Sequence, residues 1–378
     1  MRILIVGAGI GGSTLAALLE GRGHAVDLIE RSAESSNSGY ALSVWPLGSR
    51  ILIGLGLIDG FRAMANPLVT YHLRNGAGHD ITTYELSEKI AVHGDAGTLS
   101  RKDLLALLQS KFHQTHLRMS THVQALEQTD HDVTVTFNDQ SQATYDLVVG
   151  ADGIHSSIRQ MIAGEVKPHE TGWGGWVWWA PSDVVPVTEV TEYWGAGRFL
   201  GLYPCREQLC VFAGGPLEHD FKHTHPSAQD IRNHFAAIVP TLPAVFDALP
   251  ADASKIFFWK LDDVRSPIWS KGRVVLLGDA ATAFLPTAGV GASNAMESAA
   301  VLADELLRVE ARTVPRALRL FEKRHRQRVQ TAQQESRNLA KVMFVGSSPL
   351  AWARDELMKH YPVDNFVSGI MKSLDEPM

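Results

Sequence analysis

Cysteine is nearly absent from this sequence of 378 residues, which contains only Cys205 and Cys210. Two thiols cannot build a disulfide framework or a cysteine-rich zinc site, so both classes of small stapled domain are excluded. The scarcity favours a reducing compartment. We therefore expect a cytoplasmic protein in which both cysteines are ordinary core residues.

An excess of charge of one sign is also lacking, since 35 lysines and arginines stand against 41 acids, for a formal net charge of −6. A mildly acidic chain has no general attraction for nucleic acid or for an anionic membrane surface. The most apolar stretch, Met1 to Leu19, is interrupted by glycines and is followed by Glu20. A membrane span needs about 20 predominantly apolar residues, so we expect no membrane and no nucleic acid as partner.

Hydrophobic residues are plentiful at 45% of the chain, which is enough for two substantial units. Arg2–Val6 is a continuous apolar run typical of a buried parallel strand, Ser13–Glu20 has a helical stripe of leucines, and Ala25–Ile29 is a second strand. This order predicts a βαβ unit. Further on, Leu68–Leu73 and Ile81–Leu86 flank a glycine-rich turn and predict an antiparallel hairpin.

A glycine-rich turn connects the first strand to the helix and has the pattern G-x-G-x-x-G. The first glycine of this pattern allows a tight bend, the second lets the backbone approach a pyrophosphate, and the last lets helix and strand pack closely. The helix N-terminus supplies free N–H groups for phosphates. An acid ends the second strand at about the 20-residue separation expected of a group that binds an adenosine ribose. The candidate dinucleotide-binding residues here are Gly7, Gly9, Gly11, Gly12, Glu30 and Arg31.

Tryptophan is concentrated in one region, because five of the nine lie between Trp173 and Trp194. Short runs rich in β-branched and aromatic residues fill 165–261 and predict an antiparallel sheet. A buried strand at Val274–Leu277 then leads into a second glycine-rich turn and a helix from about 292 to 307. Residues 315–345 are helical and strongly charged, and we expect their basic side chains to form a solvated face.

Two more segments end a strand in an acid, one at Asp152 within Asp146–Arg159 and one at Asp279 after Lys271. Together with the glycine turn, they have the order and spacing seen in the FAD-dependent aromatic hydroxylases. These are the single-component flavoprotein monooxygenases with the p-hydroxybenzoate-hydroxylase fold. The chain resembles this family over roughly residues 1–330.

The resemblance implies an α/β fold in which a Rossmann-like FAD-binding domain carries an inserted antiparallel β-sheet substrate domain and C-terminal helices. The expected FAD-binding domain is discontinuous and comprises 1–67, 87–164 and 262–330. The expected substrate domain comprises 68–86 and 165–261, and a C-terminal helical segment comprises 331–378.

The resemblance also implies residue roles. Asp279 would accept from a ribityl hydroxyl of FAD, and the backbone around Gly291 would approach the flavin ring, where a side chain would clash. Arg101 would reach the phosphate and ribityl region. Asp152 and Arg159 would link the FAD and nicotinamide regions, or would form a purely structural pair. The cofactor-binding candidates in these segments are Arg101, Asp152, Asp279, Pro286, Gly289, Val290, Gly291 and Asn294.

FAD is expected to be non-covalent, because Thr282, and not a cysteine or histidine, follows the alanines after Asp279. The family takes hydride from NAD(P)H without a second nucleotide-binding domain, and this chain has no second glycine fingerprint after a strand. The implied reaction adds O2 to reduced FAD, giving a C4a-hydroperoxide that hydroxylates an activated small aromatic or heteroaromatic ring. Expected partners are that substrate, O2 and NAD(P)H, in a monomer or a homodimer.

The tryptophan-rich sheet and the 68–86 hairpin are the expected site of substrate selection. Arg198 and Tyr203 flank an apolar strand there and are the candidate catalytic residues, with His72 as the next candidate. Alternatives on the same fold are a flavin-dependent reductase and a monooxygenase that inactivates a polycyclic drug. A halogenase is a further alternative, suggested by the near match of Trp176–Pro181 to its tryptophan motif. A flavin-binding protein without chemistry is the non-enzymatic alternative.

No metal site is expected. The histidines that could suggest one lie together in a polar segment with no matching ligands elsewhere, and we expect them to be solvated: His219, His223 and His225.

Overall fold

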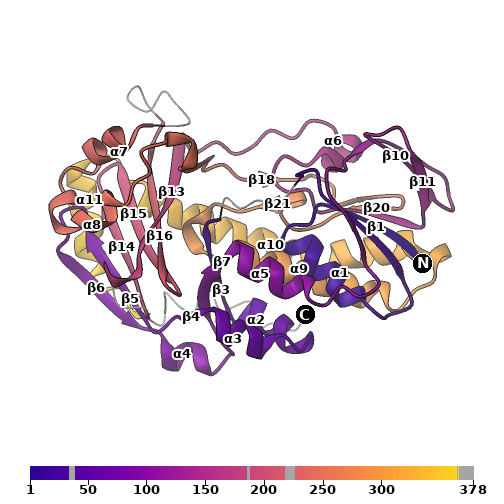
Figure 1. Cartoon of the computed structure of the whole chain (residues 1–378), viewed down its shortest axis with the longest axis horizontal. Coiled ribbons are helices and arrows are strands. Elements are labelled where there is room, and N and C mark those ends of the chain that lie inside the picture. The colour runs from indigo at the N-terminus through magenta and orange to yellow at the C-terminus, as the bar shows by residue number, and fades with distance from the viewer. Residues whose placement is uncertain (34–38, 185–187, 218–225, 364, 366–378) are drawn as a thin grey trace.

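The computed structural model describes residues 1–33, 39–184, 188–217, 226–363 and 365. The histidines His219, His223 and His225 lie outside these residues. Two sheets lie at opposite ends of the molecule, and the long helix α10 (Val314–Met343) runs behind both (Figure 1). Among the described residues, no helix is both long and apolar enough to cross a membrane.

The first sheet has six strands, and its strand pairs are parallel except at the β19–β20 edge. The first βαβ unit is confirmed, since β1 (Arg2–Val6) and β2 (Ala25–Ile29) have the expected bounds. Helix α1 (Ile10–Leu19) begins three residues before the expected Ser13, so its first turn includes two glycines of the fingerprint. The remaining strands are β8 (His116–Arg118), β12 (Leu147–Gly150), β19 (Ser270–Lys271) and β20 (Val274–Leu276).

Helices α1 and α9 (Gly291–Leu306) pack against each other in the core of this half. The strands read as apolar runs because they are buried on both faces, and Ile3, Leu4 and Ile5 have no exposed surface. A three-stranded sheet of β9 (Val123–Gln128), β10 (Val133–Phe137) and β11 (Gln142–Tyr145) lies at its edge. Other helices of the chain are α2 (Pro46–Gly54), α3 (Ile58–Met64), α4 (Ser87–Ala91), α5 (Arg101–Gln109) and α6 (Ser157–Ala163).

The second large sheet has seven strands in the order β17-β13-β16-β15-β14-β5-β6. The expected hairpin is confirmed and adds its two strands to the tryptophan-rich sheet, so segments far apart in sequence share one sheet. The strands pair antiparallel as expected, except that β5 pairs with β14 in parallel. No short turn joins those two strands, so nothing local imposes an antiparallel pairing. The strands are β5 (Thr70–Asn75), β6 (Asp80–Glu85), β13 (Trp173–Pro181), β14 (Glu189–Gly195), β15 (Arg198–Cys205), β16 (Gln208–Pro216) and β17 (Phe257–Lys260).

The two faces of this sheet have different neighbours. One face packs Trp176, Trp178 and Leu200 against α7 (Ala228–His234) and α8 (Pro243–Asp247), and this forms a separate core. The opposite face, which includes Phe199 and Tyr203, is turned toward the half of the molecule that contains the six-stranded sheet and toward the end of α10. Small sheets join the two halves: β3 (Ala41–Val44), β7 (Gly97–Ser100) and β4 (Asn66–Pro67), and β18 (Val264–Arg265) with β21 (Thr282–Ala283).

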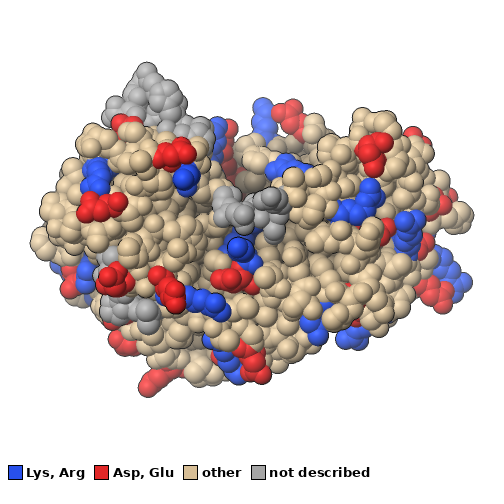
Figure 2. All heavy atoms as spheres, viewed as in Figure 1, with Lys and Arg blue, Asp and Glu red and all other residues tan. Residues whose placement is uncertain are grey.

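Helix α10 is continuous through residue 330, the expected end of the FAD-binding part, and is followed by α11 (Ser348–Met358). The division of the chain into FAD-binding, substrate and C-terminal parts stays a prediction. The basic side chains of α10 fall into two groups. Arg324 contacts Asp304 and Arg328 contacts Glu297, whereas Arg316, Arg319 and Lys323 are exposed, as expected of a solvated face. On the face shown in Figure 2, basic and acidic side chains are interspersed.

Candidate active site

The glycine turn after β1 has two positions that only glycine can fill. Gly7 has a φ of +105°, and a Cβ there would lie 2.7 Å from the carbonyl carbon of Ala151. A Cβ at Gly12 would overlap the carbonyl oxygen of Gly7. Gly11 lies beside Ala295, where α1 packs on α9, since an added Cβ would be 3.6 Å from the Ala295 Cβ. These glycines bring strand and helix together, as the fingerprint requires.

Gly9 differs from these glycines, because no atom lies within 4 Å of a Cβ added there. It is the residue before the first turn of α1, whose first backbone N–H groups have no partner within the helix. The N-terminus of α1 therefore has open space in front of it and partial positive charge, which together could hold a phosphate.

Glu30 is held next to this turn by its own carboxylate. One oxygen accepts from the Ala8 N–H at 3.0 Å, and the other accepts from the Ser32 N–H at 3.0 Å. The half-buried acid at the end of β2 is thus fixed beside the glycine turn, with acceptor sites left for a ribose. Arg31, the next residue, is exposed.

Asp152 and Arg159 do not form a direct ion pair. The Asp152 carboxylate accepts from the Ser157 N–H at 2.7 Å and from the Ser156 hydroxyl at 2.6 Å, at the start of α6. The buried Arg159 guanidinium donates to the carbonyl oxygens of Ile154, at 2.6 Å, and Ala280, at 3.0 Å. Arg159 therefore fastens the Asp-Gly segment to the turn that holds Asp279.

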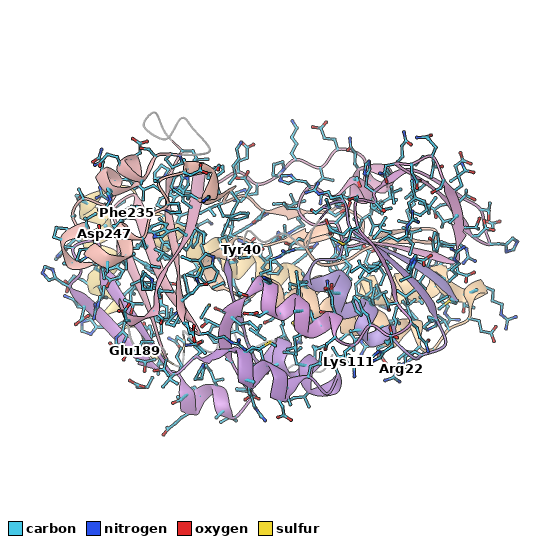
Figure 3. All side chains as sticks on the ribbon, viewed as in Figure 1. Arg22, Tyr40, Lys111, Glu189, Phe235 and Asp247 are labelled. Carbon is cyan, nitrogen blue, oxygen red and sulfur yellow. The ribbon has the colours of Figure 1, made fainter. Side chains whose placement is uncertain are left out.

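Asp279 lies in a short 3-10 turn, Gly278–Ala280, directly after β20. Its side chain is exposed at a recess of the surface, and desolvation by the protein atoms around it raises its pKa to about 6. Among the described residues it has no hydrogen-bond partner. Burial also raises the pKa of Tyr40. The charge of Arg101 lowers this pKa and the charge of Asp279 raises it, so both side chains lie near Tyr40. Figure 3 shows Tyr40 between the two halves of the molecule.

The recess beside Asp279, called here the first recess, spans about 220 Å³ of space that is partly open to solvent. Two buried polar atoms on its wall, the Thr282 hydroxyl and the Trp269 indole nitrogen, have no hydrogen-bond partner in the described part of the chain. The recess also includes Gly291, the first residue of α9, and a Cβ added to Gly291 would come no closer than 3.9 Å to protein. An unpaired acid, unpaired donors and an open glycine at a helix N-terminus fit the ribityl chain and the ring of a flavin.

The loop before α9 is the short 3-10 turn Pro286–Ala288 followed by Gly289, which has a φ of +61°. Val290 is buried and Asn294 is tied back to it, because the Asn294 side-chain amide donates to the Val290 carbonyl at 3.1 Å. The second glycine-rich motif therefore forms a turn that leads directly into α9 at Gly291.

A second recess, of about 260 Å³, lies between this loop and the tryptophan-rich sheet. Its wall combines the loop with strands β14, β15 and β16, and it contains one acid that the sequence interpretation missed. Because the glycine loop also borders the first recess, the two recesses are adjacent across Pro286 and Gly291. Residues of the second recess used below are Glu192, Phe199, Tyr203, Phe212, Pro286 and Thr287.

Glu192 is 8% exposed and accepts three hydrogen bonds. Tyr71 and Tyr203 donate their hydroxyls at 2.6 and 2.7 Å, and the Trp194 indole donates at 2.9 Å. Burial raises the pKa of Glu192, against the lowering effect of the three donors. A signal was available in the sequence, because Val190, Glu192 and Trp194 share one face of a strand whose other members there are apolar.

Of the two catalytic candidates, only Tyr203 borders the second recess. Arg198 is five residues away on the same strand, β15, and alternation along that strand gives it the opposite face. His72, on β5, contacts Thr83 at 3.0 Å and Glu189 at 3.3 Å, away from the recess. The structure thus does not bring Arg198 and His72 together with Tyr203.

The remaining sequence features are structural. Trp176 and Trp178 of the halogenase-like motif are core residues with at most 1% exposure. Cys205 and Cys210 are buried free thiols, as expected, and burial raises the pKa of Cys210 to about 12. Within the described residues, no group of three or more potential ligands could hold a metal ion.

The parallel sheet and the two glycine turns are the features expected of a flavin-dependent enzyme. Residues 1–336 match the model of a family described as FAD binding domain, and the chain belongs to that family. The protein is an oxidoreductase that uses FAD, an FAD-dependent monooxygenase of the aromatic-hydroxylase kind expected from its motifs.

Among characterised relatives, the chain is 29% identical to the 6-hydroxynicotinate 3-monooxygenase of Bordetella bronchiseptica, over 89% of this chain and 90% of that protein. It is 26% identical to the FAD-dependent urate hydroxylase of Klebsiella pneumoniae, over 99% and 98%. The crystal structure of Klebsiella pneumoniae HpxO with FAD and uric acid has a TM-score of 0.89 at 25% identity, and covers 99% of this chain and 96% of that one.

Proposed function

We propose that the enzyme uses NAD(P)H and O2 to hydroxylate a small aromatic or heteroaromatic ring bound in the second recess, with FAD held non-covalently. The observation that carries this proposal is the shared glycine loop. Pro286 and Thr287 border the second recess, and Gly291 borders the first, so a flavin ring at this loop would face a ring bound against the sheet.

The FAD would be held by groups that the fold already positions. The N-terminus of α1 at Gly9 would take the pyrophosphate, and Glu30 would accept from the ribose hydroxyls. Asp279 would accept from the ribityl chain, with Arg101 nearby on the same side. The N-terminus of α9 at Gly291 would point its partial positive charge at the pyrimidine part of the flavin.

The overall reaction consumes one NAD(P)H, one O2 and one proton, places one oxygen atom on the ring and releases the other as water. Bound FAD supplies the hydride acceptance from NAD(P)H and the activation of O2. The protein contributes position and polarity. Tyr203 and Glu192 would accept a hydrogen bond from a hydroxyl or ring N–H of the substrate, which raises the electron density of the ring for electrophilic attack.

The lining of the second recess favours an aromatic substrate. It is mainly apolar, with the carboxylate of Glu192 and the hydroxyls of Tyr203 and Thr287 as its polar groups, as is typical of a site for a ring with a few polar substituents. A small ring is proposed because the relatives named above are a 6-hydroxynicotinate 3-monooxygenase and a urate hydroxylase.

The test is a screen of small aromatic compounds against the purified protein reconstituted with FAD. We expect one or more compounds to stimulate NAD(P)H oxidation with matched oxygen uptake and a product heavier by one oxygen atom. Turnover that persists without oxygen would identify a reductase instead. Failure to take up FAD, or oxidation that no compound stimulates, would overturn the proposal.

A further inference from the structure

The lining of the second recess contains one acidic side chain and no basic one. Its described lining consists of Glu192, Tyr203, Thr287 and apolar residues, with no lysine, arginine or histidine among them. On strands β14, β15 and β16 the one basic residue is Arg198, which lies on the other face of the sheet. Arg354, on helix α11, donates to the Trp194 carbonyl at 2.7 Å. The recess therefore has a buried carboxylate and no counter-charge for a bound anion.

The hydroxyl hydrogens on this wall are already used. Tyr203 donates its hydrogen to Glu192, and Thr287 donates its hydrogen to the Ser336 carbonyl at 2.8 Å. The Ser336 hydroxyl beside Thr287 is itself committed to the Leu285 carbonyl at 2.8 Å. A hydroxyl that has donated its hydrogen can only accept. Glu192 has taken three donors of roughly four that an ionised carboxylate can accept, so it also still accepts.

We infer that this recess selects aromatic rings that carry hydrogen-bond donors and no negative charge, and that it rejects aromatic carboxylates. This inference rests on the proposed function, because it takes the second recess to be the substrate site. A carboxylate placed there would lose its hydration, find no donor and lie beside Glu192. A ring N–H, amide or hydroxyl would instead donate to Tyr203 or Glu192, so specificity comes from both attraction and repulsion.

The inference predicts a different preference from the compounds in the names of the relatives. Hydroxynicotinate and urate are anions at neutral pH, and those are the compounds in these names. The predicted preference of this chain rests on the carboxylate of Glu192 in the second recess.

The experiment uses two matched pairs of ligands, 6-hydroxynicotinamide with 6-hydroxynicotinate and 3-hydroxybenzamide with 3-hydroxybenzoate. Each pair has nearly the same shape and differs in charge. The FAD-loaded enzyme is titrated with each compound, and Kd is obtained from the change in flavin absorbance without NAD(P)H. We expect the amide of at least one pair to bind ten times more tightly than its carboxylate, and no pair to show the reverse.

Glu192→Gln then tests the cause, because it keeps the shape and removes the charge. The amide-to-carboxylate ratio should fall toward one in this variant. Glu189→Gln is the matched control, since Glu189 lies on the same strand, outside the recess, and contacts His72. That variant should keep the wild-type ratio.

Equal or tighter binding of the carboxylates by the wild-type enzyme overturns the inference, and so does the absence of binding by all four compounds. The wild-type ratio decides this even where Glu192→Gln fails to fold. Hydroxylation of a carboxylate would leave the proposed function standing and remove only the charge selection. If the amides bind selectively but no compound tested yields a hydroxylated product, the charge selection would stand and the proposed function would be overturned.

Discussion

The Arg159 guanidinium donates a 3.0 Å hydrogen bond to the carbonyl of Ala280, which directly follows Asp279. The Asp-Gly and Gly-Asp motifs, far apart in sequence, are thereby joined through one buried side chain. Arg159 also binds the Ile154 carbonyl, and burial lowers its pKa, against the opposing charge of Asp152. Arg159 thus sets the position of the turn that carries Asp279, which is proposed to bind the cofactor.

Arg159→Met should therefore weaken both the fold and FAD binding. Two carbonyl oxygens lose a charged donor, and a cost of about 2–4 kcal/mol in the free energy of unfolding is expected. Denaturant unfolding of the apoprotein and FAD titration measure the two effects. Arg22→Met, at an exposed position shown in Figure 3, is the control and should change neither. Normal FAD affinity in a stable Arg159→Met protein would contradict the positioning role.

Gly291 allows a test of flavin contact that does not disturb the fold. Since an added Cβ would lie 3.9 Å from the nearest protein atom, Gly291→Ala should fold with an unchanged Tm. It should nevertheless lower FAD affinity, and Gly291→Val should abolish activity, because the side chain would enter the space proposed for the ring. The matched control is Gly54→Ala in helix α2, where no atom lies within 4 Å of an added Cβ. Normal flavin spectra and turnover in Gly291→Val would disprove the contact.

Tyr203 and Arg198 are five residues apart on β15, and the sheet separates their effects. Tyr203→Phe removes a hydrogen-bonding group from the recess, so substrate affinity should fall about tenfold, equivalent to about 1.4 kcal/mol, with FAD content unchanged. Arg198→Gln should leave substrate affinity near the wild-type value. The measurement is substrate titration of NAD(P)H oxidation together with peroxide release. If Arg198→Gln lowered substrate affinity more than Tyr203→Phe does, substrate selection would lie on the face of the sheet that carries Arg198.

Much of the FAD-type half could be predicted from sequence because its signals are local. A few neighbouring residues are enough to predict strand β1 from its apolar run, the tight turn at Gly7 and the acid Glu30 beside that turn. The bounds of β1 and β2 are as predicted, and α9 and α10 differ from prediction by one or two residues at each end.

The substrate side could be predicted only in outline, since its geometry depends on pairings between distant segments. Nothing near Thr70 indicates that β5 will pair in parallel with β14 at Glu189. Without that pairing, Tyr71 and Glu192 have no reason to be assigned to one cluster. A single acid in a strand is usually solvated, and only the structure shows that three donors bind the buried Glu192.

His325 should make the fold sensitive to acid. It is 1% exposed, hydrogen-bonded to Ser298 at 2.9 Å, and its pKa is lowered to about 3 by burial and by Arg328 and Arg324. The unfolded chain binds this proton near pH 6.5, so stability falls as pH decreases from 6.5 to 3, by about 1.4 kcal/mol per pH unit. His325→Gln should flatten this part of the stability curve. His113→Gln, at an exposed position, should not, and equal slopes in all three proteins would refute the assignment.

Asp279 should affect the apoprotein and the FAD complex in opposite directions. Its pKa is raised from an ordinary value of 3.8 to about 6, because desolvation disfavours the charged carboxylate. The folded apoprotein thus holds this proton more tightly than the unfolded chain does. The stability that this provides is complete below pH 4 and is lost as pH rises through 6. Asp279→Asn removes the charge, so above pH 6 the variant apoprotein should unfold at a higher denaturant concentration than the wild type.

The same substitution, Asp279→Asn, should weaken FAD binding, since the ionised carboxylate is the proposed acceptor for a ribityl hydroxyl. Loss of that bond corresponds to about 1–3 kcal/mol, or roughly a 5- to 150-fold weaker affinity at pH 8. Denaturant unfolding of apoprotein and FAD titration on the same preparations measure the two effects. A general folding defect would lower both stability and affinity. Only a carboxylate that is costly to bury and is used by the cofactor gives a more stable apoprotein that binds FAD less well, so a loss of both would contradict this role for Asp279.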